Sequence, residues 1–168
     1  MILTTERLTI RPQALADAPA LFAILSDAEA MRFWNRSRMT RLAVVEDLMR
    51  EQQAAMDSGL CRYWTLVRDG EGIGSVDLSL IEGGSAELGF LLRPDCWGMG
   101  LATEAVGAVV AHGFGPMGLT HVAAATQTGN RAAARVLEKN GFVHIRTRNV
   151  VLAGGESRDC AFYRHVAP

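Results

Sequence analysis

Two glycines stand one residue apart in the segment RPDCWGMGLATE, between an apolar run and a helix-forming sequence. A helix that begins directly after such a turn exposes unpaired backbone N–H groups and the positive end of its dipole. Gly98 and Gly100, with the small Ala102, remove side chains that would keep a ligand at a distance. The pattern is typical of a seat for a phosphate or pyrophosphate group. A tight turn that binds nothing would use the same glycines.

Two other phosphate motifs do not fit this segment. A P-loop requires a lysine directly after its last glycine, whereas Lys139, the one lysine of the chain, lies far along the sequence. A dinucleotide fingerprint requires a third glycine where this chain has Thr103, and an acidic residue where it has GLTHV. A nucleotide-dependent oxidoreductase is therefore disfavoured.

Helices and strands in mixed order are expected to position this turn. Alternation and helical periodicity predict a strand at about 3–11, helices at 16–27 and 40–59, three strands within 61–94, a helix at 100–114, a strand at 119–127, a helix at 130–141 and a hairpin at 142–166. Asp17, Thr40 and Asn130 are the expected N-caps. The hairpin turns are expected at DGEG, EGGS and AGGE. This order indicates a mixed sheet covered by helices.

Composition limits the classes of partner. The chain has 168 residues, which suits one domain over 1–168, and its net charge of −1 favours neither a nucleic-acid nor a membrane partner. Three widely spaced cysteines, Cys61, Cys96 and Cys160, indicate a reducing, cytoplasmic location. Neither metal-ligand spacing, a signal peptide nor a long apolar span is found, so we expect no metal. We expect a monomer or a homodimer.

The segment ELGFLLRPDCWGMGLATEAV resembles the acyl-CoA-binding motif of the GNAT superfamily of acetyl-CoA-dependent N-acetyltransferases. It is particularly similar to the branch that contains the ribosomal-protein alanine acetyltransferases, with Trp97 in place of the usual Gln or Arg. TERLTIRP, AEAMRFW and NRAAARVLEKNGF extend the similarity over nearly the whole chain. The resemblance implies an α+β, GNAT-type fold: a central mixed, mostly antiparallel twisted sheet of about seven strands, flanked by about four helices.

The same resemblance implies where acetyl-CoA is held as co-substrate. The backbone that would grip its pyrophosphate is that of Gly98, Met99, Gly100, Leu101, Ala102 and Thr103. The pantetheine arm would pair like an added strand with Leu91, Leu92 and Arg93, and Asn130 would hydrogen-bond it from the other side. Asn130 is equally suited to be a plain helix cap. A backbone N–H near Leu92 is the candidate donor to the oxyanion.

Acetyl transfer to nitrogen needs a neutral amine, whereas a lysine-like amine of pKa about 10.4 is almost entirely charged at neutral pH. Glu87 is the candidate general base, because it stands alone at the start of an apolar strand, just before the glycine turn. If it faces an apolar pocket, its pKa is raised; the alternative is an exposed hairpin end. Many family members carry a tyrosine as general acid where this chain has Leu137, so no general acid is assigned.

The acceptor pocket is expected at the arginine-rich loop MRFWNRSRMTR, which offers Trp34 beside Arg32. Such a loop suits an acceptor with a carboxylate or phosphate, and it is equally typical of a solvated surface in which Trp34 covers the core edge. The expected activity is direct transfer of acetyl from acetyl-CoA to a primary amine, on a protein N-terminus or a small molecule. The alternative is a catalytically weak acyl-CoA-binding module of the same fold.

Overall fold

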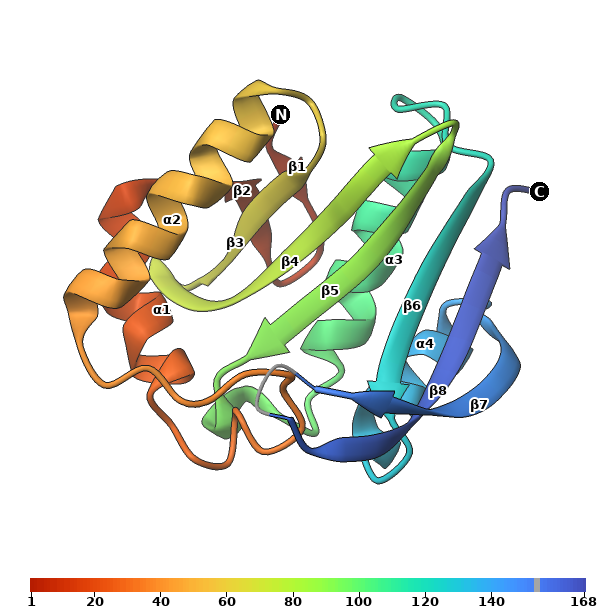
Figure 1. The fold of residues 1–168 in the computed structure, drawn as a ribbon. Helices are drawn as coiled ribbons and strands as arrows, with labels where there is room; N and C mark the ends of the chain where they lie inside the picture. The colour runs from red at the N-terminus through yellow and green to blue at the C-terminus, as the bar shows by residue number, and fades with distance from the viewer. Residues whose placement is uncertain (153–154) are drawn as a thin grey trace.

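In the computed structural model, which describes residues 1–152 and 155–168, the strands form one sheet in the order β1-β2-β3-β4-β5-β6-β8-β7 (Figure 1). The strands are β1 (Leu3–Thr4), β2 (Thr9–Pro12), β3 (Arg62–Arg68), β4 (Glu71–Glu82), β5 (Ser85–Leu92), β6 (His121–Gln127), β7 (Val143–Val151) and β8 (Ser157–Val166). Every neighbouring pair is antiparallel except β5 and β6, which run parallel. The expected mixed, mostly antiparallel sheet is confirmed.

Helices cover both faces of this sheet. They are α1 (Ala18–Leu25), α2 (Leu42–Asp57), α3 (Leu101–Phe114) and α4 (Arg131–Lys139), with single 3-10 turns at Leu15–Asp17 and Pro94–Cys96. Figure 1 shows α1 and α2 in front of the sheet and α3 behind it. The alternation of β5 reflects these two layers, because Leu92 packs in the core beneath α3 whereas Leu91 packs beneath α1 and α2. Odd-numbered residues of β5 therefore face the α1–α2 side.

The sequence predicts one continuous strand at about 3–11, whereas the structure has two short strands there, β1 and β2. The chain turns back between β1 and β2, where Thr5 N donates to Leu8 O at 2.9 Å, so the sheet has eight strands rather than about seven. The physical reason lies in α3: Glu104 accepts hydrogen bonds from the Thr5 hydroxyl and from the backbone N–H of Arg7. These contacts stabilise the turn more than continued pairing would.

One expected helix cap is confirmed and two are wrong. Asn130 accepts a hydrogen bond from Ala133 N at 3.1 Å and caps α4. Thr40 does not cap α2, because the helix begins one residue later than expected, with Arg41 in the cap position. Asp17 stands at the cap position of α1, but its carboxylate forms an ion pair with Arg11 instead. A charged partner outcompetes the neutral N–H groups of the first turn.

The hairpin turns fall where glycines permit positive φ. Gly70 in DGEG has φ 83°, and Gly83 and Gly84 in EGGS have φ 56° and 78°. The predicted hairpin of β7 and β8 is confirmed by their antiparallel pairing. Its turn was expected at AGGE, of which residues 153 and 154 lie outside the described residues.

Candidate active site

The central strands β5 and β6 separate partway along their length. Their parallel pairing joins only three residue pairs, from Ser85 with His121 to Glu87 with Ala123. Beyond this point both strands continue, β5 to Leu92 and β6 to Gln127, without pairing to each other. The two strands therefore diverge over residues 88–92 and 124–127, and Figure 1 shows the ribbons of β5 and β6 apart there. We call this gap in the backbone pairing the opening.

The β5 side of this opening presents free backbone groups. Arg93 N donates to Ile73 O of the neighbouring strand at 2.8 Å. Hydrogen-bonded pairs alternate along an antiparallel ladder, so Leu91 and Arg93 direct their backbone groups toward β4, whereas Phe90 and Leu92 direct theirs into the opening. Of the three residues expected to pair with pantetheine, Leu92 is thus the one with outward backbone groups. Its N–H is the one suited to donate to an oxyanion.

The glycine turn, Gly98–Gly100, lies at the same end of the sheet as the opening. Gly98 has φ 74° and Gly100 φ 78°, values that favour glycine, so the turn requires both residues for its bend. Gly100 is the N-cap of α3, and the first helical bond is Glu104 N to Gly100 O at 3.1 Å. Within the described residues, no N–H from Gly98 to Thr103 has a protein acceptor. Six N–H groups are therefore free to hold an anion.

Arg7 and Glu104 hold the glycine turn against the N-terminal strands. The Arg7 guanidinium donates to Met99 O at 2.8 Å and forms an ion pair with Glu104 at 2.7 Å. Burial acts to raise the pKa of Glu104, but the hydrogen bonds from Thr5 and Arg7 outweigh it, so the pKa is lowered and the carboxylate stays charged. Arg7 therefore ties both the turn and the first turn of α3 to the N-terminal strands.

Trp97 is less buried than a purely structural anchor would be. Its indole N–H donates to Leu92 O at 2.8 Å, which ties the start of the turn to the end of β5. The residue is nevertheless 43% exposed, so its ring is not fully buried. The 3-10 turn at Pro94–Cys96 turns the chain outward before Trp97, which leaves one face of the ring to solvent.

The opposite side of the opening is built by the end of β6 and the start of α4. Asn130 uses its side-chain oxygen for the helix cap, which leaves its amide N–H groups available to a ligand. Gln127 donates to Phe33 O at 3.0 Å and so fastens the loop of residues 26–41 to this edge. The sequence alone did not indicate this link between Gln127 and the loop.

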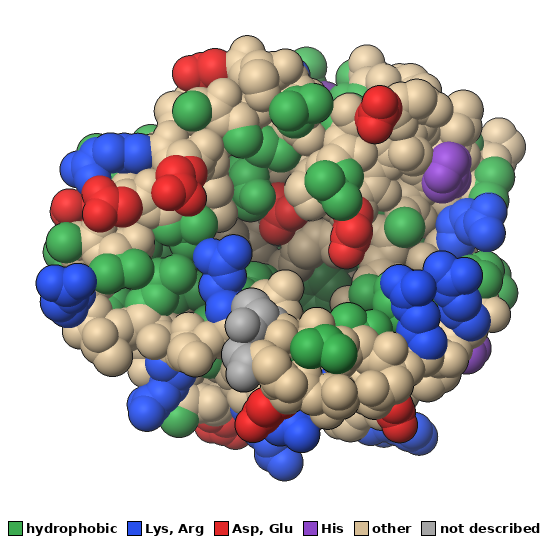
Figure 2. Space-filling view, viewed as in Figure 1, with side chains coloured by type: hydrophobic (Ala, Val, Ile, Leu, Met, Phe, Trp, Pro, Cys, Tyr) green, Lys and Arg blue, Asp and Glu red, His purple; other side chains and the backbone are tan. Residues whose placement is uncertain are grey.

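Two carboxylates lie on the α1–α2 face beside the opening. Asp77 of β4 pairs in register with Gly89, and Glu87 is its diagonal neighbour on β5. Such neighbours stand about 7–8 Å apart. In Figure 2 acidic side chains, in red, lie within a hollow over the middle of the sheet. Among the described residues, neither Asp77 nor Glu87 forms an ion pair, whereas Asp17 and Glu104 both do.

The environments of these two carboxylates differ. Glu87 is exposed, so the expectation that it faces an apolar pocket is wrong, because β6 covers only its strand edge. Asp77 is partly covered by its neighbours. Burial is the main cause that raises the pKa of Asp77 to about 7; the Ser79 hydroxyl acts to lower this pKa, and the charge of Glu87 adds to the rise. A carboxyl group that titrates near neutral pH is suited to acid–base chemistry.

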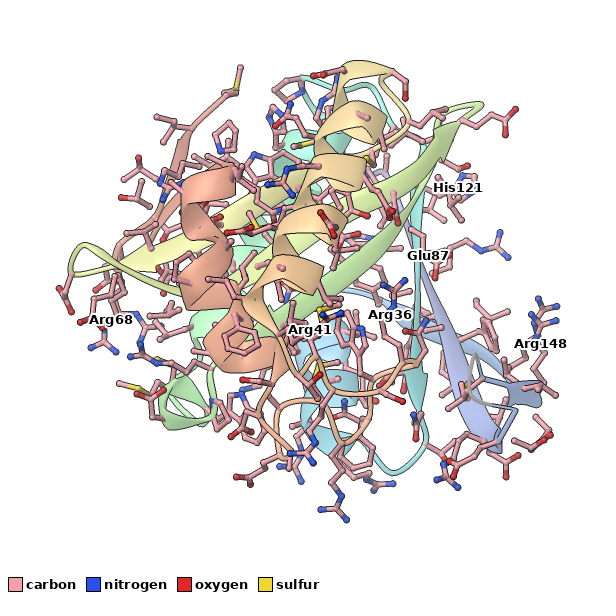
Figure 3. All side chains as sticks on the ribbon, turned by 60° about the vertical axis from the view of Figure 1, so that its left-hand side comes forward. Arg36, Arg41, Arg68, Glu87, His121 and Arg148 are labelled. Carbon is pink, nitrogen blue, oxygen red and sulfur yellow. The ribbon has the colours of Figure 1, made fainter. Side chains whose placement is uncertain are left out.

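The arginine-rich loop contributes less to the site than its composition suggested. Trp34 packs on the core beneath α1 and α2, and the Arg32 guanidinium lies 5.1 Å from the Phe33 ring. Figure 3 shows Arg36 and Arg41 on the side of β5 that carries Glu87. Both arginines belong to the loop MRFWNRSRMTR that the sequence indicated as the acceptor side.

Asp77 is the principal residue that sequence reasoning missed. It is the one charged residue inside the alternating stretch GIGSVDLSLI, on the face of β4 that also carries Ser75 and Ser79. A carboxylate in the middle of a long central strand, away from both turns, was the signal that could have identified it. Its relation to Gly89 depends on strand register, which the sequence does not specify locally.

A mixed sheet whose central parallel strands separate beside a glycine turn at a helix start is the architecture of acyl-CoA N-acyltransferases. A model of the acetyltransferase (GNAT) domain family matches residues 7–143. The chain belongs to this GNAT family and is an N-acetyltransferase.

Its relatives agree with this assignment. The chain is 30% identical to YoaA, an uncharacterized N-acetyltransferase of Bacillus subtilis, over 99% of this chain and 97% of the relative. The structure of RimL, a ribosomal L7/L12 alpha-N-protein acetyltransferase in complex with coenzyme A, matches with a TM-score of 0.89 at 17% identity, covering 99% and 98% of the two chains. The ribosomal-protein-S5-alanine acetyltransferase of Vibrio fischeri matches with a TM-score of 0.83 at 19% identity, covering 99% and 97%. At identities of 17% and 19%, these two matches show that the chain shares the fold of both structures.

Neither a metal-ligand cluster nor a helix able to span a membrane is found in the described part of the chain. Residues 1–152 and 155–168 contain no group of three or more His, Cys, Asp or Glu side chains arranged to hold a metal ion. No described helix combines the length and the apolar character needed to cross a membrane.

Proposed function

We propose that the protein transfers acetyl directly from acetyl-CoA to a primary amine. The observation that carries this proposal is the opening between β5 and β6, with free backbone groups on one side and six unpaired N–H groups at its end. An unpaired strand edge suits an extended arm that adds to β5 as a strand, and the N–H groups of Gly98–Thr103 suit a pyrophosphate. RimL, a structural neighbour, has been solved with coenzyme A.

In the proposed reaction the amine reaches the thioester from the α1–α2 face. Glu87, on that face where the opening begins, takes a proton from the ammonium, directly or through water. The nitrogen then forms a bond to the acetyl carbon, and the Leu92 N–H donates to the resulting oxyanion. The carbon–sulfur bond breaks with its electron pair on sulfur. The nitrogen loses its second proton and the sulfur takes up one proton, so CoA leaves as the thiol and one proton is released overall.

The acceptor that we favour is a protein N-terminus. RimL and the Vibrio fischeri relative are described as acetyltransferases of ribosomal proteins. An α-amine has a pKa of about 7.8 and is partly neutral at pH 7, so it requires less help from a base than a lysine-like amine does. A small-molecule amine is the competing acceptor.

The cytoplasmic location and the monomeric or dimeric state remain predictions.

A specific observation favours a second candidate, an acyl-CoA-binding module with weak catalysis. Leu137 is buried and offers no proton donor where many family members place a tyrosine. Release of CoA thiol from acetyl-CoA, measured with a panel of amines, decides between the two. Saturable, amine-dependent release supports the transferase. Tight acetyl-CoA binding by calorimetry, without release for any amine, would support the module.

A further inference from the structure

The carboxylate of Asp77, on β4, lies over Gly89 of the neighbouring strand β5. A β carbon placed on Gly89 would lie 2.5 Å from Asp77 Oδ1 and 3.1 Å from its Cγ. The Asp77 side chain therefore occupies the space directly over Gly89, which no other residue type would leave free. This places a carboxylate from β4 over β5, the strand that borders the opening.

The position over Gly89 lies beside the reacting atoms of the proposed transfer. Gly89 is followed by Phe90, whose backbone groups face the opening, and Leu92 N–H stands further along the same edge. Glu87 precedes Gly89 on the same face. A nitrogen that approaches the thioester from this face would pass between the two carboxylates.

Building on the proposed function, we propose that Asp77 is a second catalytic carboxylate, which contacts the acceptor nitrogen over Gly89 and carries its second proton to the sulfur of CoA. A primary ammonium must lose two protons to become an amide. Glu87 takes the first, and water receives it. After the carbon–nitrogen bond forms, the nitrogen gives its second proton to Asp77. Asp77 then returns this proton to the departing sulfur, so CoA leaves as the thiol and Asp77 is again a carboxylate.

This role explains how the chain manages without a hydroxyl at Leu137. A thiol has a pKa of about 8.5, so transfer of a proton to its thiolate from a more acidic carboxyl group is downhill. The pKa of Asp77, raised by burial to about 7, lies just below that value and near neutral pH. The same group can therefore accept a proton from nitrogen and give it to sulfur.

The titratable groups that face Asp77 are Tyr63 and Cys61 on one side and Glu87 on the other. On β3, burial raises the pKa of Tyr63 to about 12, with Asp77 adding to the effect, and burial likewise raises the pKa of the Cys61 thiol. Both stay uncharged at neutral pH. Arg36 acts on Tyr63 from the loop, and Glu87 supplies the nearest negative charge from β5.

The test compares Asp77→Asn, which keeps the shape and loses the charge, with Gly89→Ala, which keeps the charge and displaces the carboxylate. Ser75→Ala on the same face of β4 is the matched control. We expect Asp77→Asn to lower kcat about 10²-fold or more and Gly89→Ala at least about tenfold. In all three variants the Kd for acetyl-CoA, measured by calorimetry, should stay within about twofold of the parent value, because pantetheine binds backbone groups.

The pH profile of kcat gives a readout that a merely structural role would not move. The parent should show an ascending limb near pH 7, which Asp77→Asn removes. Glu87→Gln should shift this limb to lower pH, because it removes a negative charge that raises the pKa of Asp77.

Three results count against the inference. If the parent acetylates an amine while folded Asp77→Asn keeps the parent kcat and limb over pH 6–9, Asp77 is not catalytic, and the proposed function stands. If the parent releases no CoA thiol with an alanine-initiated peptide, spermidine or phenethylamine, the proposed function fails and this inference with it. Because Gly89→Ala leaves Asp77 itself unchanged, unaltered kcat in that variant also counts against the inference.

Discussion

The Asp77 carboxylate lies directly over Gly89 of the neighbouring strand, at a distance of 2.5 Å from where a β carbon would stand. This relationship joins two residues that are paired in register across β4 and β5. It places a carboxylate without an ion-pair partner among the described residues beside the end of the β5–β6 pairing, where the backbone of Phe90 and the N–H of Leu92 face away from β4. The acceptor side of the site is therefore organised by strand register as well as by the glycine turn.

Asp77→Asn should make the protein more stable at alkaline pH. The folded-state pKa of Asp77 is raised to about 7 from an ordinary 3.8, so the folded state binds a proton more tightly than the unfolded state. The charged group therefore costs stability above pH 7, and this cost disappears as the pH falls from 7 toward 4. The Tm of Asp77→Asn should exceed that of the parent at pH 8 and approach it at pH 4. A lower Tm at pH 8 would show that Asp77 serves the fold.

Gly100→Glu should largely abolish acetyl-CoA binding, because it places a side chain and a negative charge at the start of α3. We expect the Kd, measured by calorimetry, to rise more than about 100-fold. Gly118→Glu is the control, because Gly118 also has positive φ and open surroundings but lies beyond the far end of α3. Parent-like affinity in folded Gly100→Glu would remove the pyrophosphate from this turn.

Arg7→Gln should weaken acetyl-CoA binding without changing the chemistry. The substitution releases Met99 O and leaves Glu104 without its ion pair, so the glycine turn is held less firmly. We expect KM for acetyl-CoA to rise about three- to tenfold while kcat stays within about twofold. Arg50→Gln, which breaks a surface pair on α2, provides the comparison. A fall in kcat at unchanged KM would contradict this positioning role.

Trp97→Ala should cost about 1–2 kcal/mol of unfolding free energy, since the ring is only half-buried and its indole makes one hydrogen bond. Urea denaturation measures the cost, with Leu60→Ala at a comparably exposed site as the control. A loss of 4 kcal/mol or more, on the order expected for a fully buried ring, would refute the exposed arrangement.

Glu87→Gln keeps the shape of the side chain and removes the proton acceptor. Turnover should fall about 10²- to 10⁴-fold, while acetyl-CoA binding stays nearly intact. An amine of low pKa should lose less than a lysine-like amine, because a useful fraction of it is already neutral. Assays over pH 6–9 with both kinds of acceptor provide the measurement. Parent-like turnover with every acceptor would leave the first deprotonation to water.

The sequence by itself determined the features that depend on local conformation. Gly98 and Gly100 require positive φ, Asn130 caps its helix through a neighbouring N–H, and the alternation of the strands sets their two faces. Each depends on residues within one or two turns of chain, so residue type and spacing suffice. The similarity of this chain to the GNAT family follows from the same local motifs, read in order.

Only the tertiary structure decided the relations that depend on distant residues. Asp77 reaches over Gly89 because a hairpin of defined register pairs them, and a slip of one residue would turn that carboxylate to the other face. The break between β1 and β2 arises because Thr5 and Arg7 bind Glu104, which is almost one hundred residues away. Likewise, the exposure of Glu87 depends on where β6 leaves β5. Local propensity carries no information about such pairings, because the free energy that fixes them comes from contacts made only after the chain has folded.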